Sequence, residues 1–374
     1  MRRPFFVAVA LIVCAWIAST GDLPTAQARQ PAPVEENFPT ADGVRLKGLF
    51  HRSAKPLEGD PVVILLYPPG AKNTLDGPGD WAGLARFLTE KGFHVFRFDW
   101  RGHGKSTDIV DPALFWNVKQ DNPHTGPWNT SYVKGVKDKP LKNALTTADF
   151  NAKYFPVYVN DLTAVRTHLD LKNDNGVLNS SSIYLIGVGD AATIGLFWTM
   201  QEWDRPAIAP MFNGGRVYTA TPMPKVVVNP PAGPDIAGAI WLSASKPTAL
   251  KDKSVENVVA LVPKVRTQNP MLFLTGTKEP SRPGADSKFF FEQVLQAKPK
   301  KGVESIHEQT RLVELKNANL TGTSLLGKNS ETGVEDTILQ YLEARQKDRA
   351  SVVRKERKYI TPYFVDLKHY GLNP

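Results

Sequence analysis

Asp190 is the residue of this chain whose surroundings most favour chemistry. It stands in the string Tyr184-Leu-Ile-Gly-Val-Gly-Asp-Ala191, in which an apolar, strand-like run leads through two glycines into a predicted helix. A carboxylate in the first turn of a helix could act as a nucleophile, or it could interact with the unpaired N–H groups there and stabilise the helix by roughly 0.3 to 1 kcal/mol. A nucleophile at 190 would require a minimal side chain two residues earlier, where β-branched Val188 stands. The second, structural role is therefore the one we expect.

Other catalytic and cofactor-binding patterns are absent from the sequence. There is no H-E-x-x-H motif, no phosphate-binding P-loop and no clustering of histidines and carboxylates with metal-ligand spacing. The segment Gly187-Val-Gly189 is too short for a dinucleotide fingerprint. Cys14 is the only cysteine, so a chain processed after the leader would hold no thiol for a disulfide, a thiolate metal site or a nucleophile. We predict no cofactor and no metal.

The elements that must position any site alternate between strands and helices. Strands of four to seven largely apolar residues are followed by segments whose apolar residues recur at helical spacing. Strands that are apolar on both faces and separated by helices indicate a mostly parallel sheet covered on both sides, so the predicted fold class is α/β. After a hairpin at 38–51, the expected strands are 61–67, 94–98, 183–186, 239–242, 271–274 and 311–315, and the expected helices are 81–91, 157–171, 191–200, 287–297 and 334–345.

Two long segments, 107–155 and 204–236, interrupt this alternation. Loops of this length in a compact domain are usually lids or binding loops, although they can also simply cover a sheet edge. Both leave the sheet at the carboxyl ends of predicted strands, where open parallel sheets place their ligand crevice. We therefore predict a cap over a binding crevice.

The string Phe98-Asp-Trp-Arg-Gly-His-Gly-Lys-Ser106 resembles the D-x-R-G-x-G-x-S turn of the α/β-hydrolase superfamily. Residues 184–191 fall where that family has its nucleophile elbow, and the order of elements from about residue 38 to residue 345 is also similar. The resemblance implies an α/β-hydrolase fold. It also implies that His103 is a loop residue within a fold signature and not a catalytic base.

The resemblance places a catalytic triad at positions that have lost their chemistry. The family's elbow is G-x-S-x-G, and its alignment with Gly187-Val-Gly-Asp-Ala191 puts Gly189 at the position of the serine. Glu279 follows the strand at 271–274 and falls at the position of the acid. Thr321 falls at the position of the histidine, so neither a nucleophile nor a base is expected.

The oxyanion hole of the family is also altered. One donor would be the N–H of Asp190, whose own carboxylate would oppose a developing negative charge. The other would come from Pro68-Pro-Gly-Ala71, in which only Gly70 or Ala71 has an N–H to offer.

The N-terminus has the pattern of a secretory signal. Arg2 and Arg3 precede 13 apolar residues at 5–17, which are too few to span a bilayer comfortably, and Ala26 and Ala28 occupy the A-x-A positions. We expect a signal peptide over 1–28, cleavage after Ala28, and a secreted or periplasmic protein without a stable membrane span. The domains expected after it are a linker at 29–35, a hydrolase-like domain at 36–346 and a basic, aromatic tail at 347–374.

The charge of the chain names no partner. Its 46 lysines and arginines against 37 acidic residues give +9, a modest excess for 374 residues that does not indicate nucleic-acid binding. The sequence thus favours an exported, catalytically inactive pseudo-hydrolase that binds a small molecule or peptide under its lid. The alternative is an active hydrolase of carboxylic esters or peptides that uses other residues, such as Asp190 with Glu279, Ser243 or Ser324.

Overall fold

The fold is built on one mixed sheet with helices on both faces. The computed structural model describes residues 30–70, 75, 80–204, 211–213, 216–218, 232–277, 283–298, 301–302, 304–316, 319–327, 333–356 and 364–374. The sheet has the order β1-β2-β4-β3-β5-β8-β9-β10. Its strands are β1 (Val34–Pro39), β2 (Arg45–His51), β3 (Val62–Leu66), β4 (His94–Phe98), β5 (Ile183–Val188), β8 (Ile236–Leu242), β9 (Met271–Gly276) and β10 (Arg311–Leu315).

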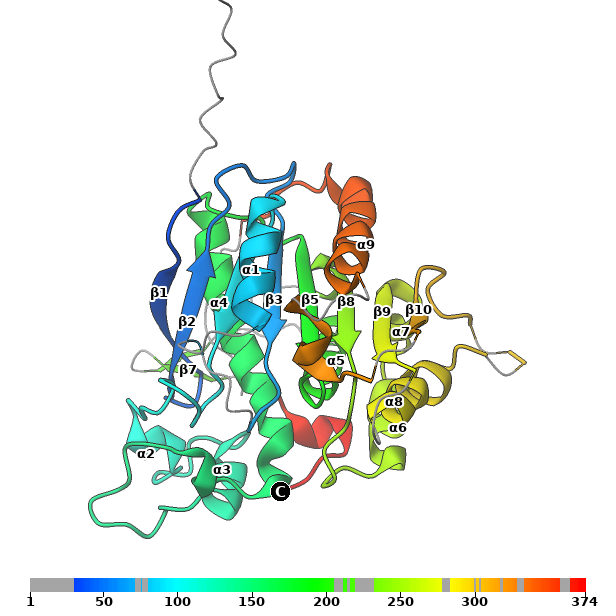
Figure 1. Ribbon diagram of the computed structural model, residues 1–374. Helices are drawn as coiled ribbons and strands as arrows, with labels where there is room; N and C mark the ends of the chain where they lie inside the picture. The colour runs from blue at the N-terminus through cyan, green and yellow to red at the C-terminus, as the bar shows by residue number, and fades with distance from the viewer. Residues whose placement is uncertain are drawn as a thin grey trace, which may run out of the picture.

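Only the first two strands break the parallel arrangement. β1 pairs antiparallel with β2, and β2 pairs antiparallel with β4, while every other pair in this sheet is parallel. Crossover helices connect the parallel strands, so the carboxyl ends of β3, β4, β5, β8 and β9 lie at one edge of the sheet. In Figure 1 that edge faces the bottom of the view.

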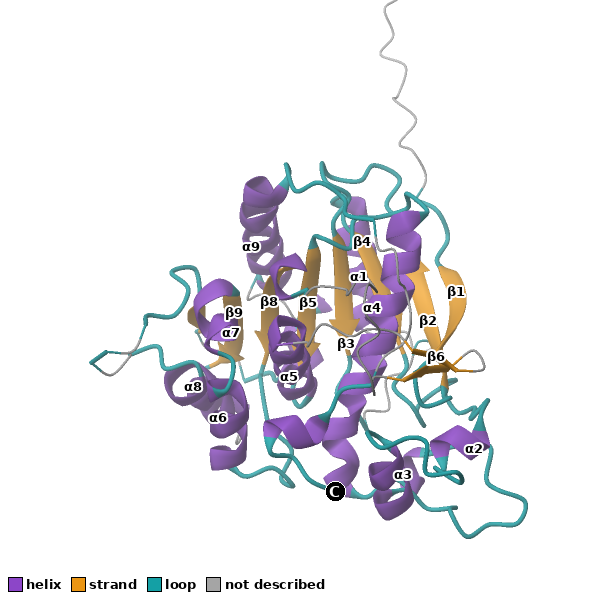
Figure 2. Cartoon of the chain, turned by 180° about the vertical axis from the view of Figure 1, so that it is seen from behind, coloured by secondary structure: helices purple, strands orange, loops and turns teal. Residues whose placement is uncertain are grey.

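Helices cover both faces because the central strands are apolar on both. Along β3, Val62 and Ile64 belong to one buried cluster and Val63 and Leu65 to the other. Helices α1 and α9 lie on one face (Figure 1), and α4 and α5 lie on the other (Figure 2). The helices are α1 (Asp80–Glu90), α2 (Pro112–Phe115), α3 (Gly126–Tyr132), α4 (Val159–Asp174), α5 (Ala191–Asp204), α6 (Asp252–Ala260), α7 (Pro263–Gln268), α8 (Pro283–Phe289) and α9 (Val334–Arg349).

The predicted fold class is confirmed, and two strands have the predicted bounds, β4 and β10. The bounds and the existence of short helices were predicted less well. The helix expected at 287–297 begins earlier, as α8, and continues as a π-helical turn at Phe290–Val294. Helices α6 and α7 were not predicted. β1 begins at Val34, within the segment expected to be a linker, because Val34 pairs with Phe50 of β2.

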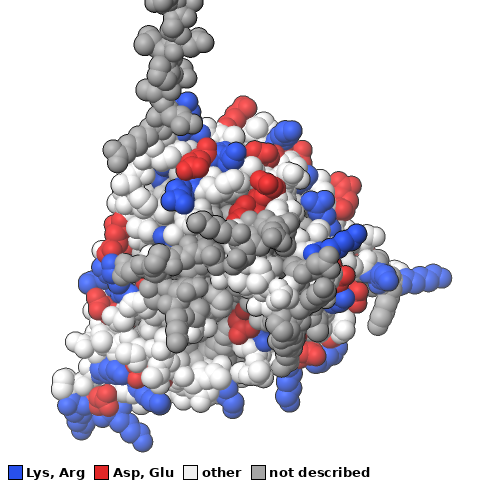
Figure 3. Space-filling model, in the orientation of Figure 1, with Lys and Arg blue, Asp and Glu red and all other residues white. Residues whose placement is uncertain are grey.

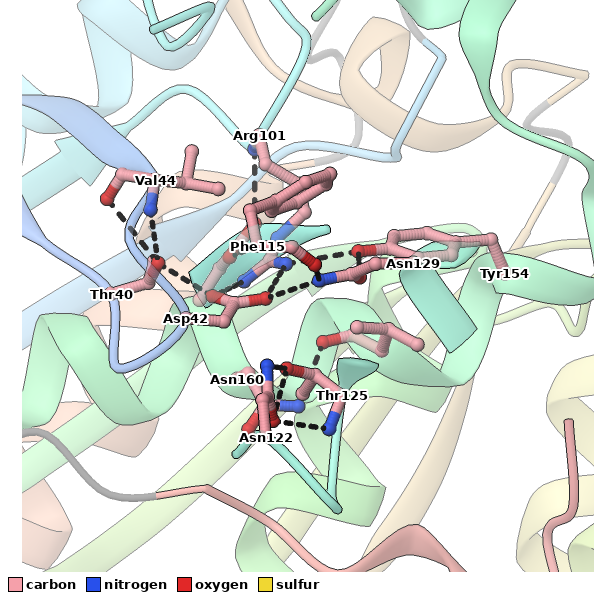
Figure 4. A network of polar contacts seen from close by, with 12 residues as sticks. Thr40, Asp42, Val44, Arg101, Phe115, Asn122, Thr125, Asn129, Tyr154 and Asn160 are labelled. Atoms are coloured by element: carbon pink, nitrogen blue, oxygen red, sulfur yellow. Dashed lines mark hydrogen bonds and ion pairs between the residues drawn. The ribbon is translucent and has the colours of Figure 1, made fainter. Parts of the chain in front are cut away.

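The first insertion, 107–155, is anchored by a buried polar network around Arg101. Arg101 forms ion pairs with Asp42 (Nη1–Oδ2, 2.6 Å) and Asp161 (Nε–Oδ1, 2.7 Å), and all three side chains are fully buried. Tyr154 accepts a hydrogen bond from Arg101 and donates one to Asn129 of α3, whose amide in turn donates to Asp42 (Figure 4). In Figure 1, α2 and α3 of this insertion lie beyond the carboxyl ends of the parallel strands.

The second insertion, 204–236, is described only in part. β6 (Met211–Asn213) and β7 (Arg216–Tyr218) form a two-stranded antiparallel ribbon, and a short 3₁₀ helix at Gly233–Asp235 leads into β8. The rest of this segment lies outside the described residues, as does the predicted signal peptide. No helix in the described ranges is long and apolar enough to cross a membrane.

The C-terminal tail returns to the domain surface. Val365, Leu367, Tyr370 and Leu372 are buried, and the backbone N–H of Val365 donates to Asn160 of α4. Of the other aromatic residues of the tail, Phe364 stacks on His124 of the first insertion, whereas Tyr359 and Tyr363 lie outside the described residues.

Candidate functional site

Gly189 lies in a tight turn between β5 and α5 at the carboxyl edge of the sheet. Its φ is +54°, in the left-handed region. The residue two positions earlier, Gly187, has no room for a side chain, because an added Cβ would lie 2.9 Å from the ring of Trp241 and 3.5 Å from the carbonyl carbon of Ala191. A residue with a left-handed φ, beside a close approach of strand and helix, is the geometry of a nucleophile elbow.

The space beside Gly189 faces Ser245. A Cβ added to Gly189 would lie 3.5 Å from Ser245 Oγ and 3.9 Å from Cγ of Pro68. Ser245 Oγ donates a hydrogen bond to Asp190 Oδ1 at 2.5 Å, and the backbone N–H of Ser245 donates to the carbonyl of Gly189. Ser245 thus holds Asp190 in place just before α5 begins. Ser245 was not singled out from the sequence.

Thr321 lies at the start of a 3₁₀ helix, Gly322–Leu325, that reaches the same edge of the sheet. The N–H of Gly322 donates to Ser243 Oγ at 2.7 Å, and a Cβ on Gly322 would lie 3.0 Å from Val188. The turn expected to carry the histidine therefore packs against the residue that precedes Gly189. It brings a threonine, whose backbone N–H and carbonyl are both bonded to Ser324.

Ser243 follows β8 with a φ of +46°, an uncommon conformation for a residue other than glycine. The side chain of Ser243 is buried and accepts the hydrogen bond from Gly322, so its hydroxyl holds the 3₁₀ turn against the strand end. Ser324 is engaged within its own turn. Neither serine contacts a histidine among the described contacts.

The N–H of Gly70, one of the two oxyanion-hole candidates after β3, is already engaged. It donates to Nε2 of His103 at 2.6 Å, while Nδ1 of the same ring lies 2.9 Å from the carbonyl oxygen of Arg101. Because the carbonyl can only accept, the proton is on Nδ1 and the ring is neutral. Burial also lowers the pKa of His103. In this conformation His103 links the loop after β3 to the turn after β4, and an oxyanion-hole role for Gly70 stays a prediction.

Two predicted site residues, Ala71 and Glu279, lie outside the described residues. Asp190, the third oxyanion-hole candidate, is described and lies beside Gly189. The structure therefore brings Gly189, Asp190 and the turn at Thr321 to one edge. Within the described residues, no group of three or more histidines, cysteines or carboxylates is placed to hold a metal ion.

The strand order and the elbow together decide the fold family. The sheet has eight strands, is mostly parallel and has an antiparallel second strand. A crossover places β4 before β3 in the strand order, and a tight turn follows β5. These features occur together in one known architecture. The chain has the α/β-hydrolase fold.

Comparisons with known proteins find only distant similarity. No protein-family model and no curated protein sequence matches the chain. Among solved structures, it is similar to a protein of unknown function from Agrobacterium tumefaciens, with 18% identity over 85% of this chain and 98% of that one and a TM-score of 0.45. It is also similar to the α/β-hydrolase GrgF from Penicillium (13% identity, 85% and 100% covered, TM-score 0.48) and to Est1E from Butyrivibrio proteoclasticus with bound ferulic acid (13%, 83% and 99%, 0.47). The assignment of the fold rests on the topology.

Proposed function

We propose that this chain is an exported pseudo-hydrolase, which binds a small molecule or peptide at the carboxyl edge of its sheet without cleaving it. The observation that carries the proposal is Gly189, which has the left-handed φ of an elbow nucleophile and no side chain. In the serine protease subtilisin, removal of the nucleophile alone lowers kcat by a factor on the order of 10⁶, so any residual activity of this chain would be slight.

The absence of a positioned base supports the same proposal. A serine or water nucleophile at this edge would need a histidine within hydrogen-bond reach. Among the described contacts, none of the seven histidines bonds to Ser245 or Asp190. Their recorded partners lie elsewhere: Arg97 for His51, Ser53 for His94, Gly70 and Arg101 for His103, Phe364 for His124, Glu36 for His168, Gln309 for His307 and Asp204 for His369.

One observation favours a second candidate, an active ester or peptide hydrolase. Ser245 Oγ lies close to where a nucleophile at 189 would project, and it already donates to the carboxylate of Asp190. In that candidate Asp190 would accept the serine proton. A carboxylate is a weaker general base than an imidazole, so Ser245 would be a poorer nucleophile than a serine paired with histidine.

Hydrolysis of p-nitrophenyl acetate and butyrate separates the two candidates. We expect the wild-type protein and Ser245→Ala to show the same rate, equal to that of buffer. Gly189→Ser should also stay inactive, because Thr321 cannot accept the proton, and Gly189→Ser combined with Thr321→His tests whether the base position is correct. Turnover by the wild-type protein that Ser245→Ala abolishes would establish the second candidate instead.

Export is part of the proposal and has its own test. Residues 1–28 carry the features of a signal peptide, and the chain holds no cysteine after Cys14. N-terminal sequencing of the protein recovered outside the cytoplasm should begin at Arg29. Recovery of the intact leader on a cytoplasmic protein would contradict this part.

A further inference from the structure

A cavity of about 690 Å³ lies on the α1 face of the sheet, away from the elbow. It is bounded by the N-terminal segment 30–33, by β2 and β4, and by α1; Figure 1 shows β1 and β2 beside that helix. Its volume is within the range of small-molecule sites, roughly 300 to 1,000 Å³. Most of its surface is apolar, and the residues that line it are Gln30, Pro31, Ala32, Pro33, Leu49, His51, Ala82, Arg86, Thr89 and Arg97.

Arg97 brings a buried positive charge to this cavity. It is only 3% exposed. Its Nε donates to His51 Nε2 at 3.2 Å and its Nη1 donates to Tyr67 Oη at 2.8 Å. Both acceptors are neutral groups. Nη2 makes no hydrogen bond with the described residues, and no carboxylate among them pairs with this guanidinium.

His51 does not supply a compensating charge. Its Nε2 accepts from Arg97, so this nitrogen carries no proton, and burial together with the neighbouring guanidinium lowers the pKa of His51 to about 4. Arg86, exposed at the rim on α1, adds a second cation and forms no ion pair with the described residues. All charged groups that line the cavity are therefore positive.

A buried charge without an opposite charge beside it is strongly unfavourable. The planar guanidinium of an arginine can pair with a carboxylate through two parallel hydrogen bonds. We propose that this cavity binds an amphiphilic carboxylate, whose head pairs with Arg97 and Arg86 and whose apolar chain lies along Leu49, Ala82 and the prolines of 31–33. The apolar lining favours such a ligand over a small hydrated anion, because an apolar chain removes that surface from water. Thr89 is not available as a further donor to the head, since its hydroxyl donates to the carbonyl of Ala85.

Calorimetric titration of the purified protein with dodecanoate, below its micellar concentration, tests the proposal. One dodecanoate should bind per chain, and dodecanol, which has the same chain without the charge, should bind at least about tenfold more weakly, the loss expected for one charge-assisted hydrogen bond. No binding of dodecanoate, or equal binding of dodecanol, would overturn the proposal.

Three variants locate the site. Arg97→Gln should weaken dodecanoate binding about tenfold or more, but it alters a buried residue and can affect folding. Arg86→Gln changes an exposed residue and should weaken binding several-fold in a fully folded protein, and Ala82→Phe should block binding by filling the cavity while both charges stay. Arg311→Gln removes an exposed arginine from β10, at the other edge of the sheet, and should bind as the wild type does. Unchanged binding in Arg86→Gln and Ala82→Phe would refute this location.

Discussion

At the scale of single residues, the feature that sets Gly189 apart is its backbone conformation in the turn between β5 and α5. Its surroundings do not forbid a side chain, because an added Cβ would make only ordinary van der Waals contacts, the nearest at 3.5 Å. The left-handed φ of +54° is the feature that glycine adopts freely and other residues adopt only at a cost. If position 189 is the nucleophile position, as proposed, glycine there avoids the local strain that active enzymes maintain for function.

Substitution of this glycine should therefore be costly for conformational reasons alone. We expect Gly189→Ala to lower the free energy of unfolding by about 1 kcal/mol or more, measured by denaturant titration. Gly83→Ala is the matched control, since Gly83 lies within α1 with open space around it and no positive φ. That change should stabilise the protein by roughly 0.5 to 1 kcal/mol. A neutral or stabilising Gly189→Ala would mean that residue 189 is not at a strained elbow, and Asp190 would have to be reconsidered as the nucleophile position.

His94 makes stability depend on pH. It is 1% exposed, and its Nδ1 accepts from the N–H of Ser53, while its Nε2 has no hydrogen-bond partner among the described residues. Burial lowers the pKa of His94 to about 4. Between pH 6.5 and 4 the unfolded chain takes up a proton that the folded chain refuses, so stability falls as pH falls, by about 2 to 3 kcal/mol at pH 4.5 from this residue. Asp161, whose pKa burial raises to about 6, acts in the opposite direction.

A comparison of variants isolates the contribution of His94 to the pH dependence of stability, because the contribution of Asp161 is common to all of them. Between pH 7 and pH 4.5, His94→Asn should lose less stability than the wild type in urea titrations. His369→Asn, which changes an exposed histidine, should follow the wild type. Parallel pH profiles for His94→Asn and the wild type would contradict the account of a buried neutral ring.

At the scale of elements, the alternation of apolar strands with amphipathic helices sufficed to predict the parallel sheet. Strands such as β4 and β10 stand between turn residues and have well-defined ends, whereas α6 and α7 are short and owe their form to packing against neighbouring elements. The pairing of Val34 with Phe50 likewise depends on tertiary contact, since residues 29–35 read locally as a linker.

Only the residues of the candidate site that belong to a recognisable motif could be singled out from the sequence. Gly189 was singled out from motif spacing because it lies in the turn directly after β5, and Thr321 because it follows the last strand, β10. Ser245 lies 55 residues beyond Asp190 and meets it only because β8 is the neighbour of β5. The sequence does show that Ser245 comes just after a buried strand. The strand order of the sheet is needed as well, because it decides which turn Ser245 faces.

The network around Arg101 should hold the first insertion to the sheet. We expect Asp42→Ala to lower the free energy of unfolding by about 3 to 5 kcal/mol, because it leaves the fully buried guanidinium with one carboxylate fewer. It should also expose residues 107–155 to limited proteolysis. Asp108→Ala, which breaks an exposed ion pair with Arg45, should cost less than about 1 kcal/mol. Equal costs for the two substitutions would argue against a special role of the buried network.

At the scale of the whole molecule, segments far apart in sequence meet around the insertion. The tail reaches His124 through Phe364 and α4 through Val365, so the chain ends against the same side of the domain that carries α2 and α3. On the face shown in Figure 3, lysines and arginines are interspersed with acidic residues. The whole molecule thus has the α/β-hydrolase architecture, and the loss of catalysis within it is our proposal.

Active-site labelling tests the central claim most directly. The purified protein is incubated with an excess of a fluorophosphonate, which phosphorylates activated serines, and its intact mass is measured. A chain with glycine at the elbow and no positioned histidine should keep its unmodified mass, while a serine hydrolase treated in parallel gains one adduct. One adduct per chain on this protein, mapped to Ser245 or to any other serine, would show that an activated nucleophile exists and would contradict the claim that the fold has lost its catalysis.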